Sequence, residues 1–143
     1  MNPLPSDLDD SAGPSSFQHY AFGDSARGLQ EEAGSRKGYA RMDALHPFTG
    51  LGGQERHFLS YSDSFYLATV GENGWPYVQH RGGPPGVLWV VDDRHLAFPD
   101  YSGNKQFISV ANVTDGSPVS LILVDYETRQ RLKIWARANV VQA

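Results

Sequence analysis

Short β-branched and aromatic segments separated by turn-forming residues dominate the chain after residue 63. There are six such segments, at residues 65–70, 75–81, 87–91, 95–98, 119–126 and 131–141. Tight turns between most consecutive segments favour antiparallel pairing, and six antiparallel strands in one sheet tend to curl into a barrel. The sequence therefore predicts a mainly β domain, a β-barrel with a few helices.

Helical spacing of apolar residues marks the part of the chain before the strands. Ala26, Leu29 and Ala33 predict a helix over residues 25–33, which Gly34 ends. Further short helices are expected at 36–44 and 54–60. Residues 1–16 are rich in Pro, Ser, Asp and Gly and are expected to form a mobile arm. We therefore expect an N-terminal arm with a short helix over residues 1–35 and one β domain over residues 36–143.

A further helix is predicted between the fourth and fifth strands. Asn104 is a good N-cap, and Phe107, Ile108 and Ala111 follow at spacings that suit a helix of about ten residues. A helix N-terminus presents unpaired N–H groups to an anion, and Lys105 adds a positive charge. Asn104 and Lys105 are therefore a candidate phosphate site, although the local sequence alone favours an ordinary N-cap beside a surface lysine.

The end of the second strand is another candidate site. Strand alternation places Gln79 and Arg81 on one face and His80 on the other, just before the Gly/Pro loop at 82–86. Polar side chains beside glycines suit the edge of a planar ring, whereas the alternative is a solvated edge strand. His80 has a side chain whose ordinary pKa suits general acid or base chemistry.

Composition and charge exclude several classes of function. The formal net charge of −4 disfavours non-specific nucleic-acid binding, and a chain with no cysteine forms no disulfide, catalytic thiolate or sulfur-ligated metal site. The five histidines lack metal-ligand spacing, so no metal is expected, and Asp92 with Asp93 is interpreted as a turn. Arg131 and Lys133 share one strand face, where an anion or nearby carboxylates would ease their repulsion.

The sequence also bears on location. Residues 1–10 have no apolar core of signal-peptide length, and no apolar run approaches membrane-spanning length. We therefore expect a cytoplasmic protein with no membrane partner. Glycine-rich nucleotide loops of the P-loop or Rossmann type and a nucleophile-elbow serine are both missing from the sequence.

Several separated blocks, taken in order, resemble the pyridoxamine 5'-phosphate oxidase-like family. The resemblance extends over about residues 35–141, and the blocks that carry it are FYLATV at 65–70, GWPYVQHRGGPPG at 74–86, GNKQFIS at 103–109 and VSL at 119–121. It implies a six-stranded antiparallel split barrel of the FMN-binding type. It further implies a homodimer with FMN at the subunit interface.

The resemblance also implies which residues contact the flavin. They are expected at the end of the second strand, after the fourth strand, around the candidate phosphate site and on the sixth strand: Gln79, His80, Arg81, Gly82, Gly83, Pro84, Pro99, Asp100, Asn104, Lys105, Gln106 and Arg131. Gln106 stands where the family has a second basic phosphate ligand, a loss for which Arg131 or Arg81 is expected to compensate. The C-terminal segment that recognises pyridoxamine phosphate has no counterpart before Ala143, so we do not predict the vitamin B6 reaction.

The expected function is that of an FMN-binding oxidoreductase, in which the flavin transfers electrons or hydride to or from a small molecule. No catalytic residue is assigned. The alternative is a non-catalytic flavin- or ligand-binding module, such as a sensor, a stress protein or a domain of a larger redox protein. A deazaflavin in place of FMN is also open. A barrel that binds single-stranded nucleic acid is disfavoured by the acidic charge.

Overall fold

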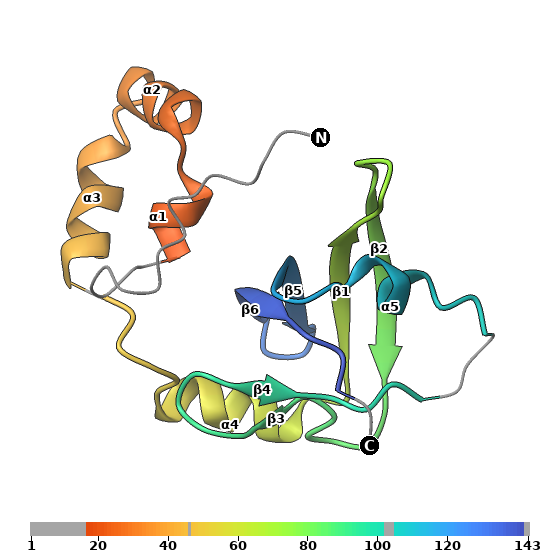
Figure 1. The fold of residues 1–143 in the computed structure, drawn as a ribbon. Helices are drawn as coiled ribbons and strands as arrows, with labels where there is room; N and C mark the ends of the chain where they lie inside the picture. Colours follow the sequence, from red (N-terminus) through yellow and green to blue (C-terminus); the bar gives the residue numbers. More distant parts are fainter. Residues whose placement is uncertain (1–16, 46, 102–104, 142–143) are drawn as a thin grey trace. The chain divides into compact units, whose positions relative to one another are not determined.

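The computed structural model describes residues 17–45, 47–101 and 105–141 and divides the chain into two compact units, Met1–Gly50 and Leu51–Ala143 (Figure 1). This division falls at Gly50, whereas the sequence placed the start of the β domain at residue 36. The predicted mobile arm, residues 1–16, lies outside the described residues. Each unit is described separately below.

The first unit contains three helices: α1 (Phe17–Ala21), α2 (Asp24–Glu32) and α3 (Arg36–Leu45). The helices predicted at 25–33 and 36–44 are therefore confirmed. The ring of Phe22 packs edge-on against that of Tyr39, with centroids 5.3 Å apart, and Arg36 Nη1 donates to Gln30 Oε1 at 2.8 Å. Neither α2 nor α3 contains a buried residue. These two helices consequently gain little stability from apolar burial.

The second unit is mainly β. Its elements are α4 (Gly53–Tyr61), β1 (Ser64–Val70), β2 (Pro76–Gly82), β3 (Trp89–Val90), β4 (Leu96–Ala97), α5 (Ile108–Asn112), β5 (Ser117–Asp125) and β6 (Gln130–Ala138). A strand forms at each of the six predicted positions, and every pairing is antiparallel. Among the described residues, no helix is both long enough and apolar enough to cross a membrane.

The six strands form two sheets rather than one. β2, β1, β5 and β6 make a four-stranded sheet in that order, and β3 pairs with β4 in a separate sheet of two-residue strands. The prediction of six strands in one curled sheet is therefore corrected: the sheet is not closed in the described part of the chain. The loop at 82–86 supplies the reason, because Pro84 and Pro85 have no N–H with which to extend the pairing beyond β2.

The core lies on one face of the four-stranded sheet. Burial alternates with a period of two along β1 and β5, so that their inward side chains meet side chains from α4 and from the segment before β3. Among the described residues, those that are buried are Phe58, Leu59, Phe65, Leu67, Thr69, Val87, Leu88, Ser109, Val119, Leu121 and Leu123. This packing fixes the inner face of β1, against which the end of β2 is placed.

The helix predicted from Asn104 is shorter and begins later. α5 starts at Ile108, because Lys105 and Phe107 have left-handed backbones, with φ of 60° and 55°. A right-handed helix requires negative φ, so it cannot run through these two residues. Asn104 itself lies outside the described residues. The predicted helix N-terminus beside Lys105 is therefore wrong, and with it the helix-dipole argument for a phosphate at that point.

Replacing Leu123 with Ala tests the position of the core. Leu123 is 0% exposed, so Leu123→Ala should lower the free energy of unfolding by about 3 kcal/mol through lost burial and a residual cavity. Leu29→Ala is the matched control, since Leu29 on α2 is 66% exposed and should change stability by less than about 0.5 kcal/mol. Urea denaturation measures both. Equal losses would contradict the described core.

Candidate functional site

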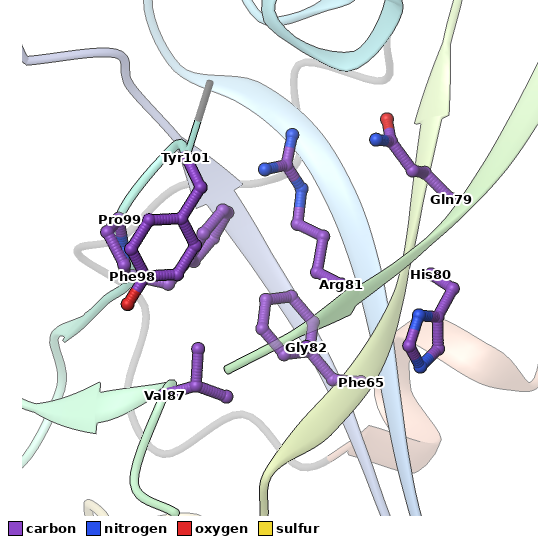
Figure 2. A pocket seen from close by; sticks show the side chains of 9 residues that line it. All are labelled: Phe65, Gln79, His80, Arg81, Gly82, Val87, Phe98, Pro99 and Tyr101. Carbon is purple, nitrogen blue, oxygen red and sulfur yellow. The ribbon is translucent and has the colours of Figure 1, made fainter. Parts of the chain in front are cut away.

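A pocket of about 150 Å³ lies where β2 ends and the segment after β4 passes over the sheet (Figure 2). Apolar and aromatic rings form part of its wall, and polar side chains of β2 form another part. The lining residues are Phe65, Gln79, His80, Arg81, Gly82, Val87, Phe98, Pro99 and Tyr101. Polar groups that converge beside aromatic rings in a hollow suit a small-molecule site.

The alternation of β2 decides which side chains face the interior. Gln79 and Arg81 are partly buried and extend from the same side of the strand in Figure 2, whereas His80 extends from the other. On that side the His80 ring packs edge-on against Tyr66, with centroids 5.3 Å apart. The predicted division of the three side chains is confirmed, and a role for the His80 ring inside the pocket loses its geometric basis.

Arg81 links both walls of the pocket. Its Nη1 donates to Asp100 Oδ1 at 2.8 Å, and its Cζ lies 5.2 Å from the centroid of the Phe98 ring, a cation–π distance. Phe98 in turn packs edge-on against Phe65 at 5.0 Å, and Phe65 is the residue directly opposite Arg81 in β1. These contacts hold the guanidinium with its side chain 13% exposed.

One donor of Arg81 remains unsatisfied. Its Nε is buried and has no hydrogen-bond partner in the described part of the chain. Leaving a buried donor unpaired costs about 1–3 kcal/mol, so such atoms in folded proteins call for an explanation. Arg81 lines the pocket, but its Nε is covered by protein atoms, so the unpaired donor does not itself face the pocket.

The side chain of Gln79 is held by a hydrogen bond from α5. Ser109 Oγ donates to Gln79 Oε1 at 2.5 Å, and Ser109 is 2% exposed. A second bond, from Asn112 Nδ2 to Thr69 Oγ1 at 3.1 Å, fastens the same helix to β1. The two bonds fix α5 against the inner face of the sheet beside the pocket.

Gly83 allows the loop after β2 to pass close to the pocket wall. A Cβ at this position would lie 2.8 Å from Val87 Cγ2 and 3.4 Å from Tyr101 Cε2. The Gly83 N–H also donates to the Asp63 carbonyl at 2.8 Å, which ties the loop to the start of β1. Only a residue without a side chain fits here without displacing its neighbours.

The structure does not bring all of the predicted flavin residues together. Gln79, His80, Arg81, Gly82 and Pro99 line the pocket, while Asp100 and Gly83 contact residues that do. The remaining described candidates do not line it: Pro84, Lys105, Gln106 and Arg131. Arg131 lies exposed on β6 opposite Val124. Asn104 lies outside the described residues.

Several pocket residues were not predicted: Phe65, Val87, Phe98, Tyr101 and the supporting Ser109. Phe65 and Phe98 were predicted to lie in strands, but neither was predicted to line a functional site. The nearest signal for Tyr101 was its position beside Asp100, a predicted flavin neighbour. Nothing in the sequence paired Ser109 with Gln79, which are 30 residues apart.

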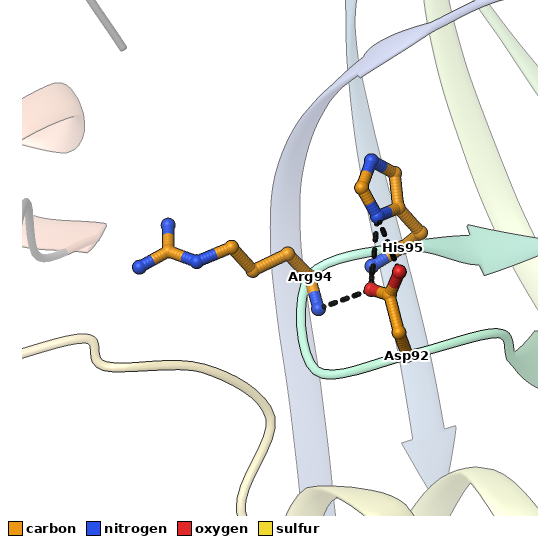
Figure 3. Close-up of polar contacts among 3 residues, drawn as sticks. All are labelled: Asp92, Arg94 and His95. Atoms are coloured by element: carbon orange, nitrogen blue, oxygen red, sulfur yellow. Dashed lines mark hydrogen bonds and ion pairs between the residues drawn. The ribbon is translucent and has the colours of Figure 1, made fainter. Parts of the chain in front are cut away.

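Asp92 has a structural role, as the turn interpretation predicted. Its Oδ1 accepts the backbone N–H groups of Arg94 and His95, each at 2.8 Å, and the His95 ring Nδ1 lies at the same distance (Figure 3). The Arg94 N–H above all, and then the His95 side chain, lower the pKa of the Asp92 carboxyl. Within the described residues, no three His, Asp or Glu side chains are grouped so as to hold a metal ion.

Comparison with known proteins agrees with this architecture. The family model for pyridoxamine 5'-phosphate oxidase matches residues 51–143. The chain therefore belongs to the pyridoxamine 5'-phosphate oxidase-like family, whose members typically bind flavin in a split-barrel fold. The searches of curated proteins and of solved structures return no match.

Substitution of Gly83 tests the close approach of the loop. Gly83→Ala should lower the free energy of unfolding by about 1–3 kcal/mol, because the new methyl group overlaps Val87. Adding Val87→Ala to Gly83→Ala should recover part of that loss. Gly53→Ala is the control, since a Cβ there meets nothing within 4 Å. If Gly83→Ala is as stable as Gly53→Ala, the described loop path is wrong.

The Asp92 turn should make stability depend on pH in the acid range. Because folding lowers the pKa of Asp92 from its ordinary value of 3.8, ionised Asp92 stabilises the folded state above that value. This contribution is lost as the pH falls through the lowered pKa. Asp92→Asn keeps an accepting oxygen but no charge, so it should be less stable than the unchanged protein at neutral pH and nearly equal to it at about pH 2. Thermal unfolding over this range measures the difference, and a gap that does not vary with pH would contradict the assignment.

Proposed function

We propose that this protein is an FMN-binding oxidoreductase that acts on a small molecule. Family membership supports a flavin, and the pocket at the end of β2, which combines aromatic rings with the polar side chains of Gln79 and Arg81, is the observation that carries the proposal. A flavin ring is planar, largely apolar on its faces and rich in acceptor atoms along one edge. Aromatic walls and polar side chains from β2 suit both properties.

The residues around the pocket fit such a ring in further respects. Gly82 and Gly83 place backbone at the pocket edge where a side chain would intrude, and Gly83 has no room for a Cβ. Phe98 and Tyr101 contribute flat surfaces from the segment after β4. We propose that Gln79, Arg81, Gly82, Gly83 and Pro99 contact the ring, with Asp100 acting through Arg81.

The size of the pocket supports a homodimer with the flavin between subunits. At about 150 Å³ it is smaller than the 300–1,000 Å³ typical of sites for drug-sized ligands, so one chain covers only part of an FMN molecule. We propose that a second copy completes the site and that the six strands act as the split barrel of the family. Asn104, Lys105, Gln106 and Arg131 remain proposed phosphate or ring ligands, with Pro84 at the rim.

In this proposal the cofactor carries out the chemistry and the protein binds and orients it. A bound flavin supplies the electron or hydride transfer, which explains why no catalytic dyad stands out. The chain orients the ring through Arg81 and Gln79 and shields it with Phe98 and Tyr101. The identity of the small-molecule substrate, the lack of a nucleic-acid partner and a cytoplasmic location stay predictions.

A non-catalytic flavin-binding module is the second candidate. It is favoured by the packing of His80, which borders the pocket but has its ring edge-on against Tyr66 on the other side of β2. Such a module would hold the same cofactor in the same place. The two candidates differ only in turnover.

The visible spectrum of the purified protein tests cofactor binding. After desalting and addition of FMN, we expect the bands of an oxidised flavin to remain with the protein. Arg81→Lys keeps the charge that pairs with Asp100 but lacks the planar guanidinium that lies against Phe98, so it should raise the Kd for FMN about tenfold. Arg137→Lys, on the exposed part of β6, is the matched control and should bind as the unchanged protein does. A protein that takes up no FMN would refute the proposal.

Anaerobic mixing of the FMN-loaded protein with NADH or NADPH then separates an enzyme from a binding module. Loss of the oxidised flavin bands, followed by their return when an electron acceptor is added, supports turnover. The opposite result has two parts. If NADH and NADPH do not reduce the bound flavin, and the dithionite-reduced protein does not pass electrons to a small acceptor, the protein is a flavin-binding module.

A further inference from the structure

The side-chain amide of Gln79 carries an oxygen and a nitrogen, so its orientation decides whether the pocket presents a hydrogen-bond acceptor or hydrogen-bond donors. An amide offers an accepting oxygen on one side and two N–H donors on the other. The Ser109 contact of 2.5 Å falls in the range for O–H···O bonds and below the range of 2.7–3.2 Å for N–H···O bonds, so the atom at Ser109 is the oxygen. The amide nitrogen is therefore turned away from Ser109.

We propose that Ser109 is a positioning residue that orients Gln79 so that its N–H₂ group faces the ligand. Gln79 and Arg81 lie on the same face of β2 and both line the pocket, so the oriented amide adds its N–H donors to the wall that holds the guanidinium. The ligand edge that lies along β2 must consequently carry acceptor atoms. This inference rests on the proposed flavin site and names the part of the ring that β2 selects.

The surroundings of Ser109 make the orientation specific. Ser109 is 2% exposed, so water does not compete for its hydroxyl group. In Figure 2 the nitrogen of the Gln79 amide lies on the side of the Arg81 guanidinium, in agreement with a shared donor edge.

The first test needs no cofactor. In the unloaded protein, the side-chain amide protons of Gln79 should have NMR shifts distinct from those of a solvated glutamine. Ser109→Ala should move them toward the solvated values, because the amide loses its fixed partner. Asn112→Ala removes the other bond of α5 and is the matched control, which should leave the Gln79 signals in place. Unchanged Gln79 signals in Ser109→Ala would overturn the inference.

The second test measures FMN binding by the same variants. Ser109→Ala should raise the Kd for FMN about fivefold and shift the flavin bands, since a hydrogen bond to the ring is no longer oriented. Gln79→Glu places an acceptor where the donor stood and should raise the Kd more than tenfold. Asn112→Ala should leave the Kd and the bands unchanged.

These outcomes separate the two proposals. If Asn112→Ala weakens FMN binding as much as Ser109→Ala does, Ser109 acts only by fastening the helix, and the inference is wrong. If the unchanged protein binds no FMN while the Gln79 signals still respond to Ser109→Ala, the proposed function fails and the positioning of Gln79 stands.

Discussion

The Arg81 guanidinium is the interaction centre on which the site depends. It pairs with Asp100, lies against the Phe98 ring and stands opposite Phe65, so it fixes the segment after β4 relative to the sheet. Residues from both walls of the pocket converge on this one side chain. Its Nε is buried and has no hydrogen-bond partner in the described part of the chain, which is costly in a protein with only a modest apolar core.

Local sequence signals predicted the elements well because they depend on neighbours in the chain. β1 and β5 follow the period of two that strand geometry imposes, and α2 follows helical spacing. An Asn-Gly pair such as Asn73–Gly74 is typical of a hairpin turn, and Gly74 has a φ of 81°. The observed loop is nevertheless longer than a two-residue turn, since Val70 pairs with Pro76. A two-residue turn would have placed Gly82, not Arg81, opposite Phe65.

Features set by contacts distant in sequence were not predictable. The strands separate into two sheets at the Gly/Pro loop of residues 82–86, where Gly83 lies close to Val87 and Tyr101. The pairing of β3 with β4 extends over only two residues of each strand. The start of α5 depends on the left-handed backbones of Lys105 and Phe107, which their side chains do not favour. The helix therefore begins at Ile108, later than the sequence predicted. The hydrogen bond between Ser109 and Gln79 was not predictable either, because it joins residues 30 positions apart in the sequence.

The ion pair between Arg81 and Asp100 also affects which residue could supply positive charge to the phosphate of the proposed FMN. Gln106 stands where the family carries a basic residue, and both Arg81 and Arg131 were candidates to restore the missing charge. Arg81 donates from Nη1 to a carboxylate at 2.8 Å, so much of its charge is already compensated. The pocket that Arg81 lines is also too small for a ring and a phosphate together. Under the proposed function, Arg81 therefore suits the ring rather than the phosphate. The positive charge beside a phosphate is better supplied by Lys105 and by an exposed arginine outside the pocket, such as Arg131.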